Sequence, residues 1–90
     1  MQKKLYRESL TRLQSELKNA TFSDHGHTQT ALELDRHVQT ILEHPGDAPF
    51  VHHYRLMNRL LEAATRFEAS HPALTSSVTG VIDALNKMGV

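Results

Sequence analysis

The apolar residues of this 90-residue chain recur at helical spacing in four segments, and none of the segments alternates as a half-buried strand would. Glycines and prolines punctuate the chain at Gly26, Pro45-Gly46, Pro49 and Pro72. Within each segment the apolar side chains step by three or four residues and therefore share one stripe of a helix. The four stripes are Tyr6, Leu10, Leu13, Leu17 and Ala20; Ala31, Leu34, Val38 and Ile41; Phe50, Tyr54, Met57, Leu61 and Ala64; and Leu74, Val78, Val81, Leu85 and Met88.

Further apolar residues widen these stripes beyond a bare heptad seam. They are Leu5, Leu42, Leu60, Phe67 and Ile82. A wide stripe suits a globular bundle better than a long two-stranded coiled coil. The sequence therefore predicts an all-α fold, a small antiparallel bundle of three or four helices, in one domain that covers residues 1–90. The helix count depends on whether Pro72 separates two helices or kinks one.

Residues that favour helix N-termini precede three of the segments. Ser23 or Asp24 can cap the second helix and Ser70 the fourth, and Asp47 or Ala48 precedes Pro49 at the start of the third. Pro72 would then lie in the first turn of the fourth helix, where its missing N–H group costs nothing. The run Glu43-His44-Pro45-Gly46 is expected to end the second helix, because a residue before proline avoids helical geometry. Gly89 is expected to end the fourth helix.

Charge also favours pairing of the first two helices. The first segment is rich in lysine and arginine, and the second is rich in aspartate and glutamate. A short connection makes the two helices antiparallel, so opposite charges would face each other. Exposed ion pairs contribute only a few tenths of a kcal/mol each, and ordinary solvated faces are an equally good interpretation.

Composition narrows the class of partner. Ten basic and ten acidic side chains cancel, which argues against a dedicated binder of nucleic acid or of acidic lipid. A role of the basic first helix in nucleic-acid binding stays a minor alternative. The chain has no cysteine, so disulfides and cysteine-ligated zinc are excluded. We find no signal peptide and no run of about 20 apolar residues that could span a bilayer. The sequence predicts a cytoplasmic protein.

Seven histidines in 90 residues make a metal site an alternative worth testing. The candidate groups are His25 with His27, His52 with His53, Glu33 with His37 and His44, and Glu68 with His71. Three of these four groups have a geometric weakness. Adjacent helical residues point about 100° apart, and the ends of the second-helix group lie about 16 Å apart along the axis. Glu68 and His71 have the Glu-x-x-His spacing of di-iron bundles, but no second copy of that motif exists. We predict no metal, no cofactor and no catalytic residues, since nucleotide-binding and nucleophile motifs are also missing.

The fourth segment carries a second, smaller stripe beside its apolar one. Ser76, Gly80 and Ala84 follow one another at intervals of four residues. Small side chains let another backbone approach closely. A glycine inside a helix costs about 1 kcal/mol relative to alanine, which favours a packing role for Gly80. These three residues are the candidate interface, facing either the other helices of the bundle or a second subunit.

The C-terminal third also resembles a known family. Arg66-Phe67-Glu68, Ser70-His71-Pro72, Leu74-Thr75, Val81-Ile82-Asp83-Ala84-Leu85 and Met88-Gly89 form a pattern similar to that of a family of short, uncharacterised bacterial proteins, a domain of unknown function. The resemblance implies a helical fold and a bacterial source, and it assigns no functional residue.

We therefore predict a non-enzymatic structural or protein-interaction module that self-associates. A small chain without disulfides leans on helix packing or on a partner subunit, and a twofold homodimer is the commonest closed assembly. A further protein partner stays open. The alternative is a helical bundle that binds a metal or a small ligand through its histidines.

Overall fold

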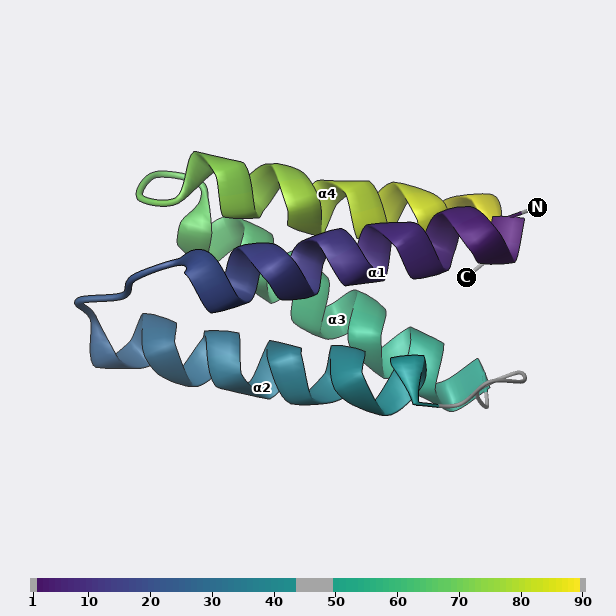
Figure 1. Cartoon of the computed structure of the whole chain (residues 1–90), viewed down its shortest axis with the longest axis horizontal. Helices are drawn as coiled ribbons and strands as arrows, with labels where there is room; N and C mark the ends of the chain where they lie inside the picture. The colour runs from purple at the N-terminus through teal and green to yellow at the C-terminus, as the bar shows by residue number, and fades with distance from the viewer. Residues whose placement is uncertain (1, 44–49, 90) are drawn as a thin grey trace.

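The computed structural model contains four α-helices, which confirms the all-α prediction (Figure 1). They are α1 (Gln2–Asn19), α2 (His25–Leu42), α3 (Phe50–Phe67) and α4 (Pro72–Lys87). The structure describes the backbone of residues 2–43 and 50–89 and the side chains of residues 4–43 and 53–89. Pro72 is the first residue of α4, so it separates two helices and does not kink a single one.

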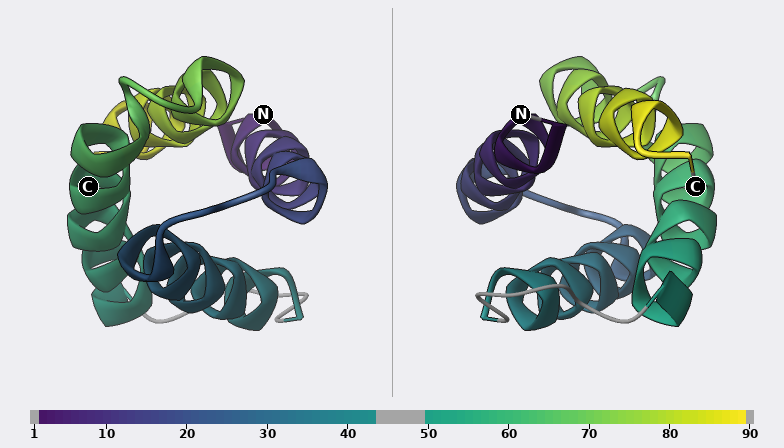
Figure 2. Two further views of the ribbon diagram at one scale, coloured as in Figure 1. Left: turned by 90° about the vertical axis from the view of Figure 1, so that its left-hand side faces the viewer. Right: turned by 90° about the vertical axis from the view of Figure 1, so that its right-hand side faces the viewer.

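Successive helices run in opposite directions and close into a ring of four. Viewed along the bundle, α1 and α4 lie on one side of the ring, and α2 and α3 lie on the other (Figure 2). α4 packs extensively against both α1 and α3, whereas the contact between α1 and α2 is the smallest of the four. The bundle measures 36 × 20 × 20 Å.

The buried side chains fill the centre of this ring. Three of the predicted stripes are confirmed: those of α1, α2 and α4 provide Tyr6, Leu10, Leu13, Leu17, Ala31, Leu34, Val38, Ile41, Leu74, Val78, Val81 and Leu85. Ala20 and Met88, at the ends of their stripes, are half-buried and pack against the core.

The predicted stripe of α3 is wrong by a rotation of the helix. Tyr54 and Leu61 were expected inside, yet they are 57% and 51% exposed. Leu60 and Phe67, which were expected to widen this stripe, are buried, and Leu56 and Ala63, which were not predicted, complete the α3 part of the core. Successive helical residues lie about 100° apart, so α3 has an apolar arc wide enough to hold both stripes. Packing between α2 and α4 buries one side of that arc and leaves the other at the surface.

Local chemistry explains the start of α2 and the end of α4. Asp24 is the N-cap of α2, as predicted, and its Oδ1 accepts a hydrogen bond from the His27 N–H at 3.2 Å. Gly89 has a φ of +87°, the left-handed conformation that ends many helices. α2 ends at Leu42, with Glu43 as its C-cap. Asp47 and Ala48, expected at the start of α3, lie outside the described residues.

The predicted cap of α4 needs correction. His71, and not Ser70, is the N-cap of α4, and His71 makes no side-chain capping bond. The Ser70 hydroxyl hydrogen-bonds to Nδ1 of His71 at 2.9 Å instead. Nε2 of His71 donates to the carbonyl oxygen of Thr21 at 2.9 Å. The His71 ring therefore ties the turn before α4 to the connection between α1 and α2.

Aromatic rings reinforce that tie at the same end of the bundle. The Phe22 ring lies 5.4 Å from Phe67 and 4.8 Å from His71, between ring centroids. His27 meets Phe67 edge-on at 5.4 Å. Such ring pairs add to the stabilisation that burial gives. The two connections at this end of the bundle are therefore held by one cluster: Phe22, His27, Phe67 and His71.

Among the residues whose side chains are described, no ion pair joins α1 to α2, where the sequence suggested such pairs. Among the described residues, hydrogen bonds join the two helices. Nη2 of Arg7 donates to the carbonyl of Leu42 at 3.1 Å, and the amides of Gln14 and Gln39 bond to each other. An ion pair links α2 to α3, between Glu33 and Arg59.

Candidate interaction surface

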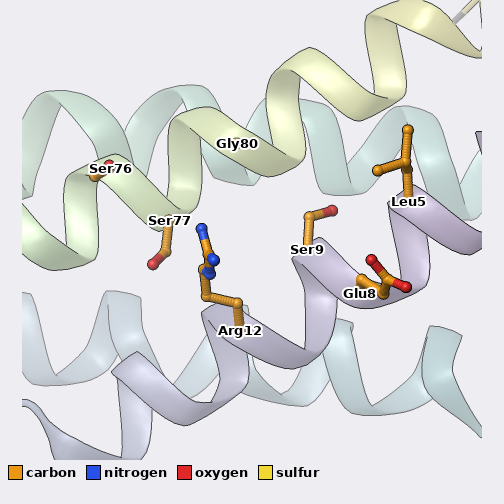
Figure 3. A pocket seen from close by; sticks show the side chains of 7 residues that line it. All are labelled: Leu5, Glu8, Ser9, Arg12, Ser76, Ser77 and Gly80. Atoms are coloured by element: carbon orange, nitrogen blue, oxygen red, sulfur yellow. The ribbon is translucent and has the colours of Figure 1, made fainter.

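A groove of about 210 Å³ runs along the surface where α1 and α4 lie side by side (Figure 3). Its lining includes two of the three residues of the predicted interface. The lining residues are Leu5, Glu8, Ser9, Arg12, Ser76, Ser77 and Gly80. We call this surface the α1–α4 groove.

One wall of the groove comes from the first three turns of α1. Leu5, Glu8, Ser9 and Arg12 follow the spacing of a helix face, beside the buried stripe that begins at Tyr6. Leu5 is 53% exposed although it is a large apolar side chain. This wall therefore offers an accessible apolar group at one end and a guanidinium at the other (Figure 3).

The opposite wall comes from α4, with Ser76, Ser77 and Gly80. Ser77 is only 6% exposed, and its hydroxyl donates to the Ala73 carbonyl at 3.3 Å. Across the groove, the Ser9 hydroxyl donates to the Tyr6 carbonyl at 2.8 Å. Gly80 leaves bare backbone, and a Cβ placed there would meet no other atom within 4 Å. An incoming side chain could therefore approach the α4 backbone closely.

The groove also carries one charge of each sign. Glu8 and Arg12 lie one turn apart on α1 and are both exposed. An i, i+4 pair of opposite charges can form an ion pair, but within the described part of the chain neither residue has an ion-pair partner. Both charges are thus available to another molecule.

The predicted stripe of small residues is divided between two environments. Ser76 and Gly80 are exposed and line the groove, whereas Ala84 is half-buried and packs against the core. Packing within the bundle therefore does not explain why a glycine occupies position 80. The α1 wall was not predicted, although Leu5, an apolar residue beside the stripe that begins at Tyr6, was a usable signal in the sequence.

The histidines do not assemble into a metal centre in the described part of the chain. No group of three or more potential ligands occurs among the residues searched there. His27 and His71 approach each other, at 6.4 Å between ring centroids, within the aromatic cluster. His53 lies elsewhere, with its Nδ1 hydrogen-bonded to the Tyr6 hydroxyl at 2.9 Å. Burial raises the pKa of that phenol well above its ordinary value. The side chains of His44 and His52 lie outside the described residues.

Comparisons with known proteins give a family and no activity. The sequence model of one family, described as "Domain of unknown function (DUF4404)", matches residues 6–90. No curated protein matches the chain, and no solved structure does. Among the described helices, none combines the length and the apolar character needed to cross a membrane.

Proposed function

The chain belongs to this family, which the comparison describes only as a domain of unknown function, and we propose from its surface that it is a non-enzymatic interaction module that forms a twofold homodimer through the α1–α4 groove. The observation that carries the proposal is the pairing of a protruding Leu5 with an open backbone at Gly80 in one groove. A surface that has both an exposed apolar side chain and a space to receive one can pair with a second copy of itself.

Twofold symmetry makes the fit specific. In a twofold interface the same patch occurs on both subunits, so each contact is made twice. Leu5 of one copy would enter the space above Gly80 of the other, away from water. Glu8 of each copy would face Arg12 of its partner. The lone carboxylate and guanidinium of the groove would then both be compensated, and the interface would carry no net charge.

Mass measurement at several concentrations tests the proposal. Light scattering behind size exclusion should give twice the chain mass of 10.2 kDa at high concentration. Leu5→Gln should shift the chain toward a monomer, because it removes the exposed apolar side chain. Leu61→Gln is the matched control, since Leu61 is exposed to nearly the same degree on α3.

Charge exchange tests the geometry of the interface. Glu8→Arg alone and Arg12→Glu alone should each weaken the dimer, because like charges would then face each other. The double variant should restore it, since the pairs are re-formed with their signs reversed. A wild-type chain that stays monomeric at millimolar concentration, or a double variant no better than either single one, contradicts the proposal.

A bacterial source and a cytoplasmic location remain predictions from the sequence and its resemblance. Fractionation of cells that express the chain from its own gene checks the location. Accumulation outside the cytoplasm would contradict it.

A further inference from the structure

A second groove, of about 440 Å³, lies between α2 and α3 and gathers three arginines. α2 contributes Glu33, Arg36, His37 and Thr40, and α3 contributes Arg55 and Arg59. We call it the α2–α3 groove, and its two helices lie across the ring from α1 and α4 (Figure 2). Nothing in the proposed dimer uses it.

The groove has more positive than negative charge. Its carboxylate, Glu33, accepts from Nη1 of Arg59 at 2.7 Å. Among the described residues, Arg36 and Arg55 have no carboxylate partner. Within the described part of the chain, two guanidinium groups from facing helices therefore border one hollow without an ion-pair partner, although the whole chain has a formal net charge of zero.

The backbone that presents these groups is regular. Arg55 and Arg59 are one turn apart on α3, and Arg36 and Thr40 are one turn apart on α2. The Thr40 hydroxyl donates to the Arg36 carbonyl at 2.9 Å, so it is engaged within its own helix. Helices hold a site more firmly than loops do, and the hollow between them has room for a small ligand.

We propose that the α2–α3 groove binds the phosphate group of a small phosphate monoester, with Arg36 and Arg55 as its principal ligands. A guanidinium group donates two parallel hydrogen bonds and matches the geometry of phosphate oxygens. A phosphate monoester is close to dianionic at neutral pH and offers three acceptor oxygens, so it can bond to both arginines at once. A long nucleic acid fits less well, because the net charge of the chain gives no extended basic track.

Glu33 sets how strongly the groove binds. It occupies Arg59 and adds a negative charge beside the incoming anion. Replacement of Glu33 by glutamine removes that charge and frees the Arg59 guanidinium. Glu33→Gln should therefore bind phosphate more tightly than the wild type. A non-specific attraction of phosphate to positive charge would not single out position 33.

Amide chemical-shift titration of the full chain at low salt tests the site. Inorganic phosphate and adenosine 5′-monophosphate are the probes, and adenosine is the control without phosphate. Both phosphate probes should shift the amides around Arg36 and Arg55 in a saturable way. Arg36→Gln and Arg55→Gln should each weaken binding about tenfold, the effect of one lost charge-assisted interaction of about 1.4 kcal/mol. Lys18→Gln, which removes one positive charge from exposed α1, should leave it unchanged.

Three results with the phosphate probes would overturn the proposal. They are no saturable shift with either phosphate probe, equal weakening by Lys18→Gln and Arg55→Gln, or weaker binding by Glu33→Gln. Saturable binding by adenosine alone would likewise contradict it, because the nucleoside carries no phosphate. Circular dichroism of each variant establishes that the bundle is intact, which is expected since all the replaced side chains are exposed.

Discussion

Gly80→Ala should stabilise the isolated subunit. Gly80 lies inside α4, and a Cβ at this position would meet no other atom within 4 Å. Nothing therefore opposes the gain in helix propensity, which is about 0.8–1 kcal/mol for alanine over glycine. Measured gains at compatible sites are about 0.4–1 kcal/mol. In a domain of this size, 1 kcal/mol moves the melting temperature by about 4–8 °C, so we expect a rise of about 2–8 °C.

Gly26→Ala is the matched control. Gly26 is also helical, in the first turn of α2. A Cβ there would lie 3.0 Å from Oδ1 of Asp24 and 3.6 Å from Nη1 of Arg66. That carboxylate oxygen is the one that caps α2. The capping oxygen must shift by a few tenths of an ångström to make room for the methyl group, so Gly26→Ala should stabilise less than Gly80→Ala or should destabilise.

Thermal melts at two concentrations give the measurement. At low concentration, where the subunit is free, Gly80→Ala should melt above the wild type. At high concentration a dimer gains stability by mass action. A methyl group in the hollow that receives Leu5 should then cost the variant part of that gain. If Gly80→Ala melts below the wild type even when the subunit is dilute, or below Gly26→Ala, the open surroundings of Gly80 are not what the structure indicates.

Three further outcomes follow from the buried groups and the cap. Burial raises the pKa of Tyr6, so folding favours the neutral phenol, and stability should fall as the pH rises above about 10, the pKa of tyrosine in the unfolded chain. In Tyr54→Phe, Tyr6 is the remaining tyrosine, and its phenolate absorbance should appear together with the loss of helix. Backbone hydrogen bonds, chiefly the one from His27, lower the pKa of Asp24. Its ionised form therefore stabilises the fold above about pH 3.9, and this contribution is lost as the pH falls further. Asp24→Ala should lower the urea midpoint at pH 7 and make little difference in strong acid. Phe67→Ala, at a fully buried ring, should cost about 3–5 kcal/mol, measured as a lower urea midpoint with loss of the cooperative transition at 37 °C.

The sequence predicts the core well wherever a helix has one apolar stripe and polar flanks. In α1, a charged or polar residue follows most core positions, so only one rotation of the helix buries its leucines. In α3, Leu60 is followed by Leu61, and Ala63 by Ala64. Two stripes then compete, and the neighbours that α3 packs against decide between them. That choice is a property of the tertiary fold, which a pattern within one helix does not contain.

The candidate sites show the same limit. Gly80 was visible in the sequence as a break in helix propensity. The other wall of the α1–α4 groove comes from residues about 70 positions earlier in the chain. The arginines of the α2–α3 groove were hidden by the balanced composition, because they converge only when α2 and α3 pack side by side. His71 was considered as a metal ligand, whereas its two ring nitrogens hold a turn together.

The two proposed surfaces together imply that the dimer is bivalent for phosphate. A twofold contact through α1 and α4 leaves both α2–α3 grooves on the outer sides, since these helix pairs lie on opposite sides of the ring (Figure 2). Two linked sites bind a surface dense in phosphate far more strongly than one site does, by a factor of about 10²–10⁴ where the geometry allows both to engage. Leu5→Gln, which changes no charge, should therefore elute from phosphocellulose at lower salt than the wild type, while its titration with free phosphate stays the same for each chain. Equal elution of a monomeric Leu5→Gln and a dimeric wild type would mean that the two grooves do not act together.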